Sequence, residues 1–308
     1  MMSTAGAEMC YYQFRAIPEI FVDYAEKASI DPMFRATTLP SLGIIERKYP
    51  TDDQVAFGYS KPWARLKTYV EHLNEQESGQ TSYKILYITR HGLGYHNVFE
   101  AEVGREAWNS HWSHLPGSGK ITWEDAHLIE EGIQQAKDLG QTYADAFAVD
   151  HLPIPKSIYT SPLARCLETT KLVFEPGLRQ QGAEFRPYIK ECLRERLTDH
   201  TCDKRSSKSW IAQNYAQYIL EPSFSEEDGL WNAERWESDS EHVARKQRLL
   251  EDIFESDQND FVALVTHSYA ISAILEVVNL GHFRMREGSS IALLIRGEKL
   301  EKGAQAQV

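Results

Sequence analysis

Two short apolar runs that lie far apart in the sequence each lead into a histidine. Residues 85–88 lead to His91, and residues 261–266 lead to His267. Continuous apolar runs of about four to eight residues, rich in branched side chains, are typical of strands that are buried on both faces of a sheet. The second run continues into a helix-like pattern over residues 270–278. The chain is therefore expected to contain buried strands that feed helices, with an imidazole just after a strand.

The rest of the chain repeats this alternation. Strands are predicted near residues 84–89, 157–160, 187–193 and 261–266, each followed by a helical pattern, and a final strand is predicted near 291–296. Alternating strands and helices favour a parallel sheet that helices cover on both faces. We predict an α/β fold, a three-layer α/β/α sandwich with a mostly parallel central sheet. Open sheets of this kind bind ligands beyond the carboxyl ends of their strands.

Polar residues suited to binding a phosphoryl group follow these strands in four segments. The segments are Arg90-His91-Gly92 with Asn97, Ser161-Pro162-Leu163-Ala164-Arg165-Cys166-Leu167-Glu168-Thr169-Thr170, Cys192-Leu193-Arg194-Glu195-Arg196, and Thr266-His267-Ser268. A further segment carries Leu128, Gly132, Gln135 and Ala136. Their order and spacing resemble the histidine phosphatase (phosphoglycerate mutase-like) superfamily over about residues 83–280. Gly94-Tyr95-His96-Asn97 and residues 200–205 resemble its fungal phosphomutase-like branch.

The resemblance implies a role for each matched residue. The catalytic residues would be His91, Glu195 and His267. The phosphate-binding residues would be Arg90, Asn97 and Arg165. Phosphoryl transfer needs a nucleophile, cations against the equatorial oxygens and a proton for the leaving oxygen. A neutral imidazole can form a phosphohistidine and arginine binds phosphate oxygens bidentately, so we predict no metal and no other cofactor.

Two residues have both a functional and a structural interpretation. Glu195 is either the general acid or an exposed carboxylate at a strand end that pairs with Arg194 or Arg196. Tyr269 stands where relatives usually carry a small residue, often glycine. Its ring either faces the pocket, where it would affect substrate specificity, or fills the core.

The expected reaction is hydrolysis of a small phosphorylated metabolite through a phosphohistidine, the activity of a phosphoric monoester hydrolase. Mutases of the superfamily carry ERxYG after the acid, whereas this chain reads Glu195-Arg196-Leu197-Thr198-Asp199. A phosphatase is therefore favoured over a phosphomutase of the phosphoglycerate mutase type. A catalytically inactive protein that binds phosphorylated ligands is a third alternative, although the full set of pocket residues argues against it. The sequence does not identify the substrate.

Net charge and hydropathy limit the classes of partner. A net charge of −12 argues against nucleic acid or an anionic membrane, because both require an extended basic surface. Residues 261–280 are apolar enough to mimic a membrane span. His267, Ser268 and Glu276 interrupt them, which favours a buried strand followed by a helix.

The cysteines and the N-terminus indicate a compartment. The chain has four cysteines without a CxxC pair and no Asn-x-Ser/Thr sequon. Both features are typical of a reducing environment. No positively charged segment followed by an apolar stretch is found near the N-terminus, so we expect no signal peptide and a cytoplasmic location.

Two local patterns suggest other functions. Pro116-Gly117-Ser118-Gly119-Lys120 resembles a nucleotide-binding loop, but His114 replaces its first glycine and Ile121 its Ser or Thr, so a turn is expected. His200, Cys202 and Asp203 suggest a metal site. No second ligand pair has zinc spacing, and a solvated charged loop is the simpler interpretation.

An N-terminal extension is predicted over residues 1–82. Its first 58 residues contain Pro18, Pro32, Pro40 and Pro50, which indicate irregular loops packed on the core. A helix follows at about residues 61–76, with apolar residues at helical spacing. This helix either packs on the edge of the domain or, as an alternative, docks a partner.

The catalytic domain is predicted over residues 83–308. Two tryptophan-containing insertions interrupt it at about residues 97–127 and 203–240. The insertions either shape the substrate site or form a structural lid packed by their tryptophans, because both roles bury large aromatic surfaces.

Overall fold

The computed structural model describes residues 11–53, 61–77 and 79–300. Their central element is a sheet with the strand order β1-β9-β2-β8-β5-β6-β7. The strands are β1 (Tyr11–Ala16), β2 (Thr81–Arg90), β5 (Ser157–Thr160), β6 (Tyr188–Ile189), β7 (Ile219–Leu220), β8 (Phe261–Thr266) and β9 (Ser290–Leu300). The pairs from β2 through β8, β5 and β6 to β7 are parallel, whereas β9 is antiparallel to both β2 and β1. The sheet is mostly parallel, as predicted.

The register of β2 and β8 brings the two predicted histidines together. Arg90 lies opposite Thr266 in the parallel ladder, so His91 and His267 follow at the same edge of the sheet. The amide of His91 donates to the carbonyl oxygen of Thr266 at 3.0 Å. The two imidazole centroids are 5.0 Å apart.

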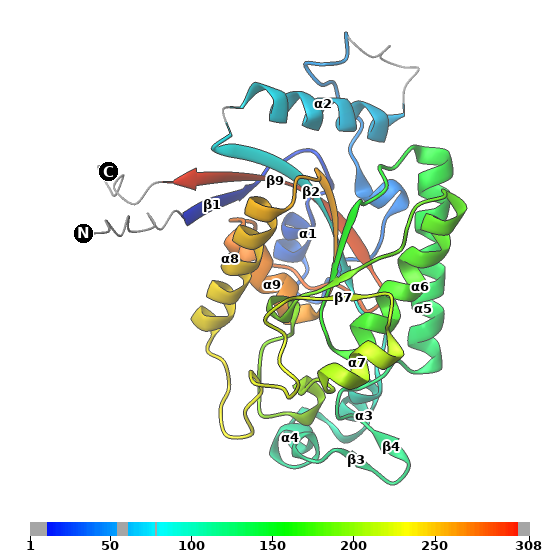
Figure 1. Ribbon diagram of the computed structural model, residues 1–308, viewed down its shortest axis with the longest axis vertical. Helices are drawn as coiled ribbons and strands as arrows, with labels where there is room; N and C mark the ends of the chain where they lie inside the picture. Colours follow the sequence, from blue (N-terminus) through cyan, green and yellow to red (C-terminus); the bar gives the residue numbers. More distant parts are fainter. Residues whose placement is uncertain (1–10, 54–60, 78, 301–308) are drawn as a thin grey trace, which may run out of the picture.

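Helices cover both faces of the sheet and complete three layers (Figure 1). One face packs against α2 (Pro62–Gln76), α5 (Glu130–Asp145) and α6 (Ala164–Gln180), and the other against α1 (Tyr24–Ile30), α8 (Asp239–Ser256) and α9 (Ser268–Val277). Side chains of a strand alternate between its faces, so Ile85 and Tyr87 pack into the first layer while Leu86 and Ile88 pack into the second. The predicted α/β/α sandwich is confirmed. Among the described residues, no helix has the length and hydropathy to cross a bilayer.

The N-terminal extension is more regular than predicted. β1 pairs with β9 from Tyr11 opposite Leu300 to Ala16 opposite Ile295, and it forms the edge of the central sheet. α1 and a short 3-10 helix, η1 (Pro40–Gly43), follow it. The prediction of irregular loops is wrong for these segments, because backbone hydrogen bonds to a distant strand stabilise β1. Residues 1–10 and 54–60, which belong to the same prediction, lie outside the described residues.

α2 packs on the core through one apolar face. Trp63, Leu66 and Val70 are fully buried against the sheet. The Trp63 indole also donates to the carbonyl oxygen of Ser41 in the extension at 3.0 Å. The apolar face of this helix is therefore covered by its own chain.

The strand predicted over residues 187–193 is wrong for most of its length. β6 covers only Tyr188–Ile189, and the chain then turns into η4 (Glu191–Leu193), a 3-10 helix. Carbonyl oxygens of this turn accept hydrogen bonds from side chains instead of from a neighbouring strand. Lys246 donates to Cys192 at 2.6 Å, and Thr266 donates to Leu193 at 2.6 Å.

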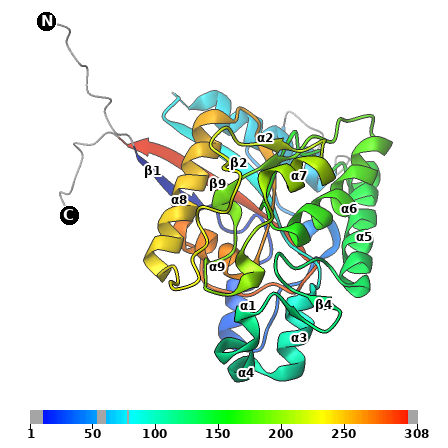
Figure 2. The same cartoon turned by 60° about the horizontal axis from the view of Figure 1, so that its bottom comes forward.

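The first insertion lies at the carboxyl end of β2, at the bottom of the view in Figure 1, and comes forward in Figure 2. It contains α3 (Tyr95–Val103), α4 (Arg105–Ser110) and a hairpin of β3 (Gly117–Ser118) and β4 (Ile121–Thr122). Gly119 occupies the hairpin turn with a φ of 60°, so the predicted turn at residues 116–120 is confirmed. The second insertion begins where η5 (Thr201–Asp203) ends and contains α7 (Lys208–Asn214) and β7, the last strand of the sheet.

Candidate active site

His91 follows β2 and is almost fully buried, with 2% of its surface exposed. Its Nδ1 lies 2.7 Å from the carbonyl oxygen of Gly92. A carbonyl only accepts hydrogen bonds, so Nδ1 carries the proton and Nε2 keeps its lone pair in the neutral ring. Burial lowers the pKa of His91 well below its usual value, and the charges of Arg165 and Arg90 lower it further. The imidazole is therefore neutral at pH 7, the form that can attack phosphorus.

Close backbone packing fixes the loop that follows β2. A Cβ atom added to Gly92 would lie 2.4 Å from the carbonyl oxygen of Gly132 in α5, and one added to Gly132 would lie 2.1 Å from the carbonyl oxygen of Leu93. Only glycine permits this approach. The amide of Leu93 donates to Gln135 at 2.9 Å, and the amide of Gly92 donates to Thr169 of α6 at 3.1 Å. Three segments that the sequence pattern had grouped thus meet at this loop.

Arg90 ends β2 and offers an unused donor. One terminal nitrogen donates to the carbonyl oxygen of Met285 at 2.6 Å, and the other pairs with Glu287 at 2.6 Å. Its Nε is buried and has no hydrogen-bond partner within the described part of the chain. Because buried donors are nearly always paired, this nitrogen is a donor that a bound group could satisfy.

Arg165, near the start of α6, is 1% exposed and touches His267. Its Nε donates to Nδ1 of His267 at 3.3 Å, and its terminal nitrogens reach the carbonyl oxygen of Cys202 at 2.8 Å and Asp203 at 3.5 Å. Since Nδ1 of His267 accepts a hydrogen bond, Nε2 carries the proton and donates to the hydroxyl of Ser161 at 2.8 Å. Both ring nitrogens of His267 are thus engaged within the protein.

Glu195 lies against the N-terminus of α9. Its carboxylate accepts hydrogen bonds from the amides of Ala270 at 2.8 Å and Tyr269 at 3.1 Å. Burial raises the pKa of Glu195, the negative charge of Asp203 raises it further, and the backbone amides oppose this only in part. A raised pKa keeps the carboxyl group protonated to higher pH, as a general acid requires.

The alternative that pairs Glu195 with Arg194 or Arg196 is wrong. Arg196 pairs with Asp239 at 2.8 Å. Arg194 is fully buried, and its terminal nitrogens bind both carboxylate oxygens of Asp228 at 2.7 and 2.6 Å. Both neighbouring arginines therefore have other carboxylate partners.

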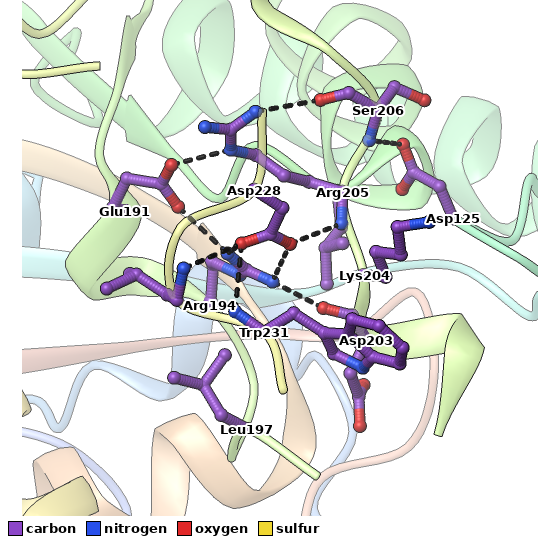
Figure 3. Close-up of polar contacts among 12 residues, drawn as sticks. Asp125, Glu191, Arg194, Leu197, Asp203, Lys204, Arg205, Ser206, Asp228 and Trp231 are labelled. Atoms are coloured by element: carbon purple, nitrogen blue, oxygen red, sulfur yellow. Dashed lines mark hydrogen bonds and ion pairs between the residues drawn. The ribbon is translucent and has the colours of Figure 1, made fainter. Parts of the chain in front are cut away.

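Figure 3 shows the buried ion-pair network that surrounds Arg194. Glu191 accepts hydrogen bonds from Arg194 at 3.1 Å and from Arg205 at 2.6 Å. Asp228 also accepts one from the amide of Arg205 at 2.9 Å. The network ties the second insertion to η4, and so fixes the backbone from which Glu195 extends.

Asn97 and Tyr269 border the same region. Oδ1 of Asn97 accepts a hydrogen bond from the amide of Gly94 at 3.1 Å and caps α3, so Nδ2 is the group of Asn97 that could contact a ligand. Tyr269 is 40% exposed, and its ring centroid lies 5.1 Å from the guanidinium carbon of Arg284. The core interpretation of Tyr269 is therefore wrong.

A cavity of about 700 Å³, which we call the His91 cavity, lies beyond the carboxyl ends of the strands. Six of the seven predicted site residues line it: Arg90, His91, Asn97, Arg165, Glu195 and Tyr269. His267 does not line the cavity itself, but Arg165, which contacts His267, does. A larger cavity, of about 1070 Å³, lies beside Phe261 at the start of β8 and includes none of the seven.

Sequence reasoning missed several residues that line the His91 cavity. Arg35 comes from the N-terminal extension, and Arg284 and Glu287 come from the loop before β9. None of them follows a predicted strand within a recognisable motif, so no pattern indicated them. The two insertions contribute Trp108 and Trp236 to the lining, whereas other tryptophans of the insertions, such as Trp123, are buried in packing.

The stretch over residues 200–205 is buried except for Lys204, so its interpretation as a solvated loop is wrong. His200, Cys202 and Asp203 are 8%, 4% and 6% exposed, and their potential ligand atoms lie within 4.8 Å of one another. The guanidinium of Arg165 already faces this cluster through Cys202 and Asp203. Burial also raises the pKa of the Cys202 thiol well above its usual value, which disfavours the thiolate that binds metals.

The sequence profile described as the histidine phosphatase superfamily (branch 1) matches residues 104–291, more than half of the chain. The chain belongs to the histidine phosphatase superfamily. The match begins after Arg90-His91-Gly92 and contains Arg165, Glu195 and His267. The resemblance and the fold predicted from the sequence are confirmed. Members of this superfamily act as phosphatases or mutases on small phosphorylated substrates.

Fungal relatives extend the similarity over most of the chain. A probable phosphoglycerate mutase of Arthroderma benhamiae is 40% identical over 298 residues, which cover 96% of this chain and 88% of the relative. Phosphomutase-like protein 3 of Candida albicans is 33% identical over 213 residues, covering 69% of this chain and 65% of that protein. Probable phosphoglycerate mutase PMU1 of Saccharomyces cerevisiae is 29% identical over 273 residues, covering 82% and 90%.

Proposed function

We propose that this histidine phosphatase hydrolyses a small phosphorylated metabolite through a phosphohistidine on His91, without a metal ion. One arrangement carries the proposal. The buried Nε of Arg90 has no partner among the described residues, and Nε2 of the adjacent His91 keeps its lone pair. A phosphoryl group bound there would satisfy the donor and meet the nucleophile.

In the first step, Nε2 of His91 attacks phosphorus and the bond from phosphorus to the leaving oxygen breaks. Arg90 and Arg165 stabilise the negative charge on the equatorial oxygens, and Asn97 adds a neutral donor through Nδ2. Glu195 gives its proton to the leaving oxygen, so the product leaves as an alcohol.

In the second step, water attacks the phosphohistidine. Glu195, now a carboxylate, takes a proton from the water, and orthophosphate leaves while His91 returns to its neutral form. His267 belongs to the same proposed site, because its Nδ1 accepts the hydrogen bond from Arg165 that orients this guanidinium. We assign the charge stabilisation to arginines, whose fork geometry matches phosphate oxygens.

A phosphomutase is the second candidate, favoured by the names of the fungal relatives. A mutase would return the phosphoryl group from His91 to a second position on the substrate instead of passing it to water. The residues Leu197-Thr198-Asp199 after Glu195-Arg196 differ from the ERxYG of mutases and support the phosphatase.

The test is a panel of phosphorylated metabolites assayed in parallel by phosphate release and by ³¹P NMR. Orthophosphate release that is lost in His91→Ala supports the phosphatase. Isomerised phosphate esters without orthophosphate would instead identify a mutase. Binding of phosphorylated ligands with neither product would identify an inactive phospho-ligand-binding protein.

We also propose the organisation and location expected from the sequence. An N-terminal extension over residues 1–82 would support a catalytic domain over residues 83–308, with insertions at about 97–127 and 203–240. Cys166, Cys192 and Cys202 are free thiols, which agrees with a cytoplasmic enzyme. Cys10 lies outside the described residues.

A further inference from the structure

The His91 cavity is larger than a phosphoryl group requires. Its volume of about 700 Å³ falls in the range of sites that enclose whole metabolites or drug-sized ligands. Six arginines line it, namely Arg35, Arg90, Arg105, Arg165, Arg196 and Arg284. Four carboxylates line it, namely Glu100, Glu195, Asp203 and Glu287. The arrangement of these charges indicates what else the cavity binds.

Four of the six arginines are paired with carboxylates. The pairs are Arg90 with Glu287 at 2.6 Å, Arg105 with Glu100 at 2.7 Å, Arg165 with Asp203 at 3.5 Å and Arg196 with Asp239 at 2.8 Å. Arg35 and Arg284 have no carboxylate partner within residues 11–53, 61–77 and 79–300. Two guanidinium groups in one cavity thus keep an uncompensated positive charge.

The backbone holds Arg35 and Arg284 side by side. The amide of Ala36 donates to the carbonyl oxygen of Arg284 at 2.8 Å, and the amide of Arg286 donates to the carbonyl oxygen of Ala36 at 2.9 Å. Met285 lies between Arg284 and Arg286 in the sequence, and its carbonyl oxygen accepts the hydrogen bond from Arg90. The N-terminal extension is therefore fixed against the loop that contacts Arg90.

Tyr269 orients Arg284. The ring of Tyr269 stacks 5.1 Å from the guanidinium carbon, and its hydroxyl accepts a hydrogen bond from Arg284 at 3.2 Å. The amide of the same tyrosine donates to Glu195. One residue thus links the proposed general acid to an arginine of the cavity lining that has no carboxylate partner among the described residues.

Arg284 also lies close to Arg90, which borders the proposed phosphoryl position. Burial lowers the pKa of Arg90, and the carboxylates of Glu287 and Glu195 oppose this in part. The like charge of Arg284 lowers the pKa further, so the two guanidinium groups repel each other. Glu287 neutralises only one of the positive charges. An additional anion would relieve this repulsion, and arginine is the side chain best suited to bind carboxylate or phosphate.

We propose that Arg35 and Arg284 form a second anion-binding subsite, so that the substrate carries a second anionic group, a carboxylate or another phosphoryl group, besides the phosphoryl group at His91. This inference rests on the proposed function only for the position of the first phosphoryl group. Tyr269 is a positioning residue for Arg284. The N-terminal extension contributes Arg35 to substrate recognition.

Non-hydrolysable ligands test the subsite without depending on turnover. Three four-carbon probes differ in their second end: butylphosphonate, 4-phosphonobutyrate and butane-1,4-bisphosphonate. Their affinities are measured by calorimetry with the full-length chain and with Arg35→Gln, Arg284→Gln and Arg286→Gln. Arg286 is exposed, is absent from the lining of the cavity and lies two residues from Arg284, so it is the matched control.

The full-length chain should bind at least one of the two probes with a second anionic group about tenfold or more tightly than butylphosphonate. The reason is that hydrogen bonds between charged groups are stronger than those between neutral groups. Arg35→Gln and Arg284→Gln should remove this preference while changing butylphosphonate binding less than about threefold. Arg286→Gln should leave both unchanged. The probe that gains affinity distinguishes a carboxylate from a second phosphoryl group.

Equal affinity of the three probes for the full-length chain, or an equal loss for all probes in the arginine variants, would overturn the subsite. A loss of the same size in Arg286→Gln would also overturn it, because that result indicates a general field effect. If phosphate release depends on His91 but the three probes bind with equal affinity, the subsite is refuted and the proposed hydrolysis is not. Probe preference without phosphate release would refute the proposed hydrolysis alone.

Discussion

Nδ1 of His91 lies 2.7 Å from the carbonyl oxygen of Gly92. This hydrogen bond fixes the tautomer of the imidazole, because a carbonyl oxygen needs a donor. It leaves Nε2 as the nitrogen with a free lone pair. The close packing of Gly92 on Gly132 keeps that carbonyl in place. The packing of a glycine pair thus supports the hydrogen bond that selects the tautomer of His91.

His91→Ala should reduce turnover by at least about a thousandfold, since a nucleophile that acts in both steps has no substitute. Rapid-quench trapping with ³²P-labelled substrate should give an acid-labile, base-stable adduct on His91. His282→Ala, a change at an exposed histidine outside the His91 cavity, is the control and should keep full activity. An active His91→Ala enzyme would exclude covalent catalysis at this residue.

Arg165→Ala should lower kcat/KM by about a hundredfold or more, equivalent to about 3 kcal/mol of lost charge stabilisation. Arg165→Lys retains the charge and should recover only part of the rate, because lysine cannot form the forked contacts. EDTA should leave the rate of the wild-type enzyme unchanged. Strict dependence on an added divalent ion would contradict the proposed role of the arginines. Melting temperatures of both variants separate lost catalysis from lost folding.

The pH dependence should follow the two shifted groups of the site. The lowered pKa of His91 keeps the nucleophile neutral into the acid range, and the raised pKa of Glu195 keeps the acid protonated above its usual range. For substrates with an alkoxide leaving group, kcat/KM should fall as pH rises through the pKa of Glu195. For p-nitrophenyl phosphate, whose leaving group needs no proton, that alkaline decrease should be weak.

Glu195→Gln tests the same assignment directly. It should cost about a hundredfold to ten-thousandfold with alkyl phosphates and much less with p-nitrophenyl phosphate. Equal losses for both substrates would indicate that Glu195 supports α9 through its backbone contacts instead of donating a proton.

Tyr269→Gly should change selectivity across a substrate panel with little loss of stability. The ring is 40% exposed, so no core cavity forms, and the cost should be about 1 kcal/mol from glycine near a helix start. Tyr269→Phe keeps the ring on Arg284 and removes only the hydroxyl contact, so its selectivity should be closer to that of the wild type. A sharply lower melting temperature with unchanged selectivity would reject the specificity role.

Asp228→Ala should destabilise the fold by about 3–5 kcal/mol, because it leaves the fully buried Arg194 without a main partner. Asp239→Ala removes the partner of Arg196, but the Asp239 side chain is 88% exposed, so this control should cost less than about 1 kcal/mol. Urea unfolding monitored by circular dichroism measures both. Equal stabilities of the two variants would contradict the importance of the buried network.

The same network makes the stability of the fold depend on pH in the acid range. Burial alone would raise the pKa of Asp228, but the hydrogen bond and charge of Arg194 lower it below its usual value. A carboxylate with a lowered folded pKa contributes stability above its unfolded pKa of about 4 and loses that contribution as pH falls through the folded value. Wild-type stability should therefore decline below about pH 4, and Asp228→Ala should reduce that dependence.

The sequence by itself determined the central strands and the core of the site. The apolar runs before His91 and His267 are typical of strands buried on both faces of a sheet that helices cover. Parallel pairing of β2 with β8 then brings the two histidines to one edge. Residues next to strand ends, such as Arg90 and Glu195, could be predicted for this reason.

Only the tertiary structure decided which distant segments complete the cavity. β1 joins the sheet through backbone hydrogen bonds to β9. Arg35 is held at the cavity because the neighbouring residue, Ala36, forms backbone hydrogen bonds with Arg284 and Arg286. Backbone groups are alike in every residue, so no side-chain pattern records such pairing. The direction of Tyr269 was also open in the sequence, because an aromatic ring suits both a core and a cavity opening. Its contact with Arg284 in space placed the ring at the cavity.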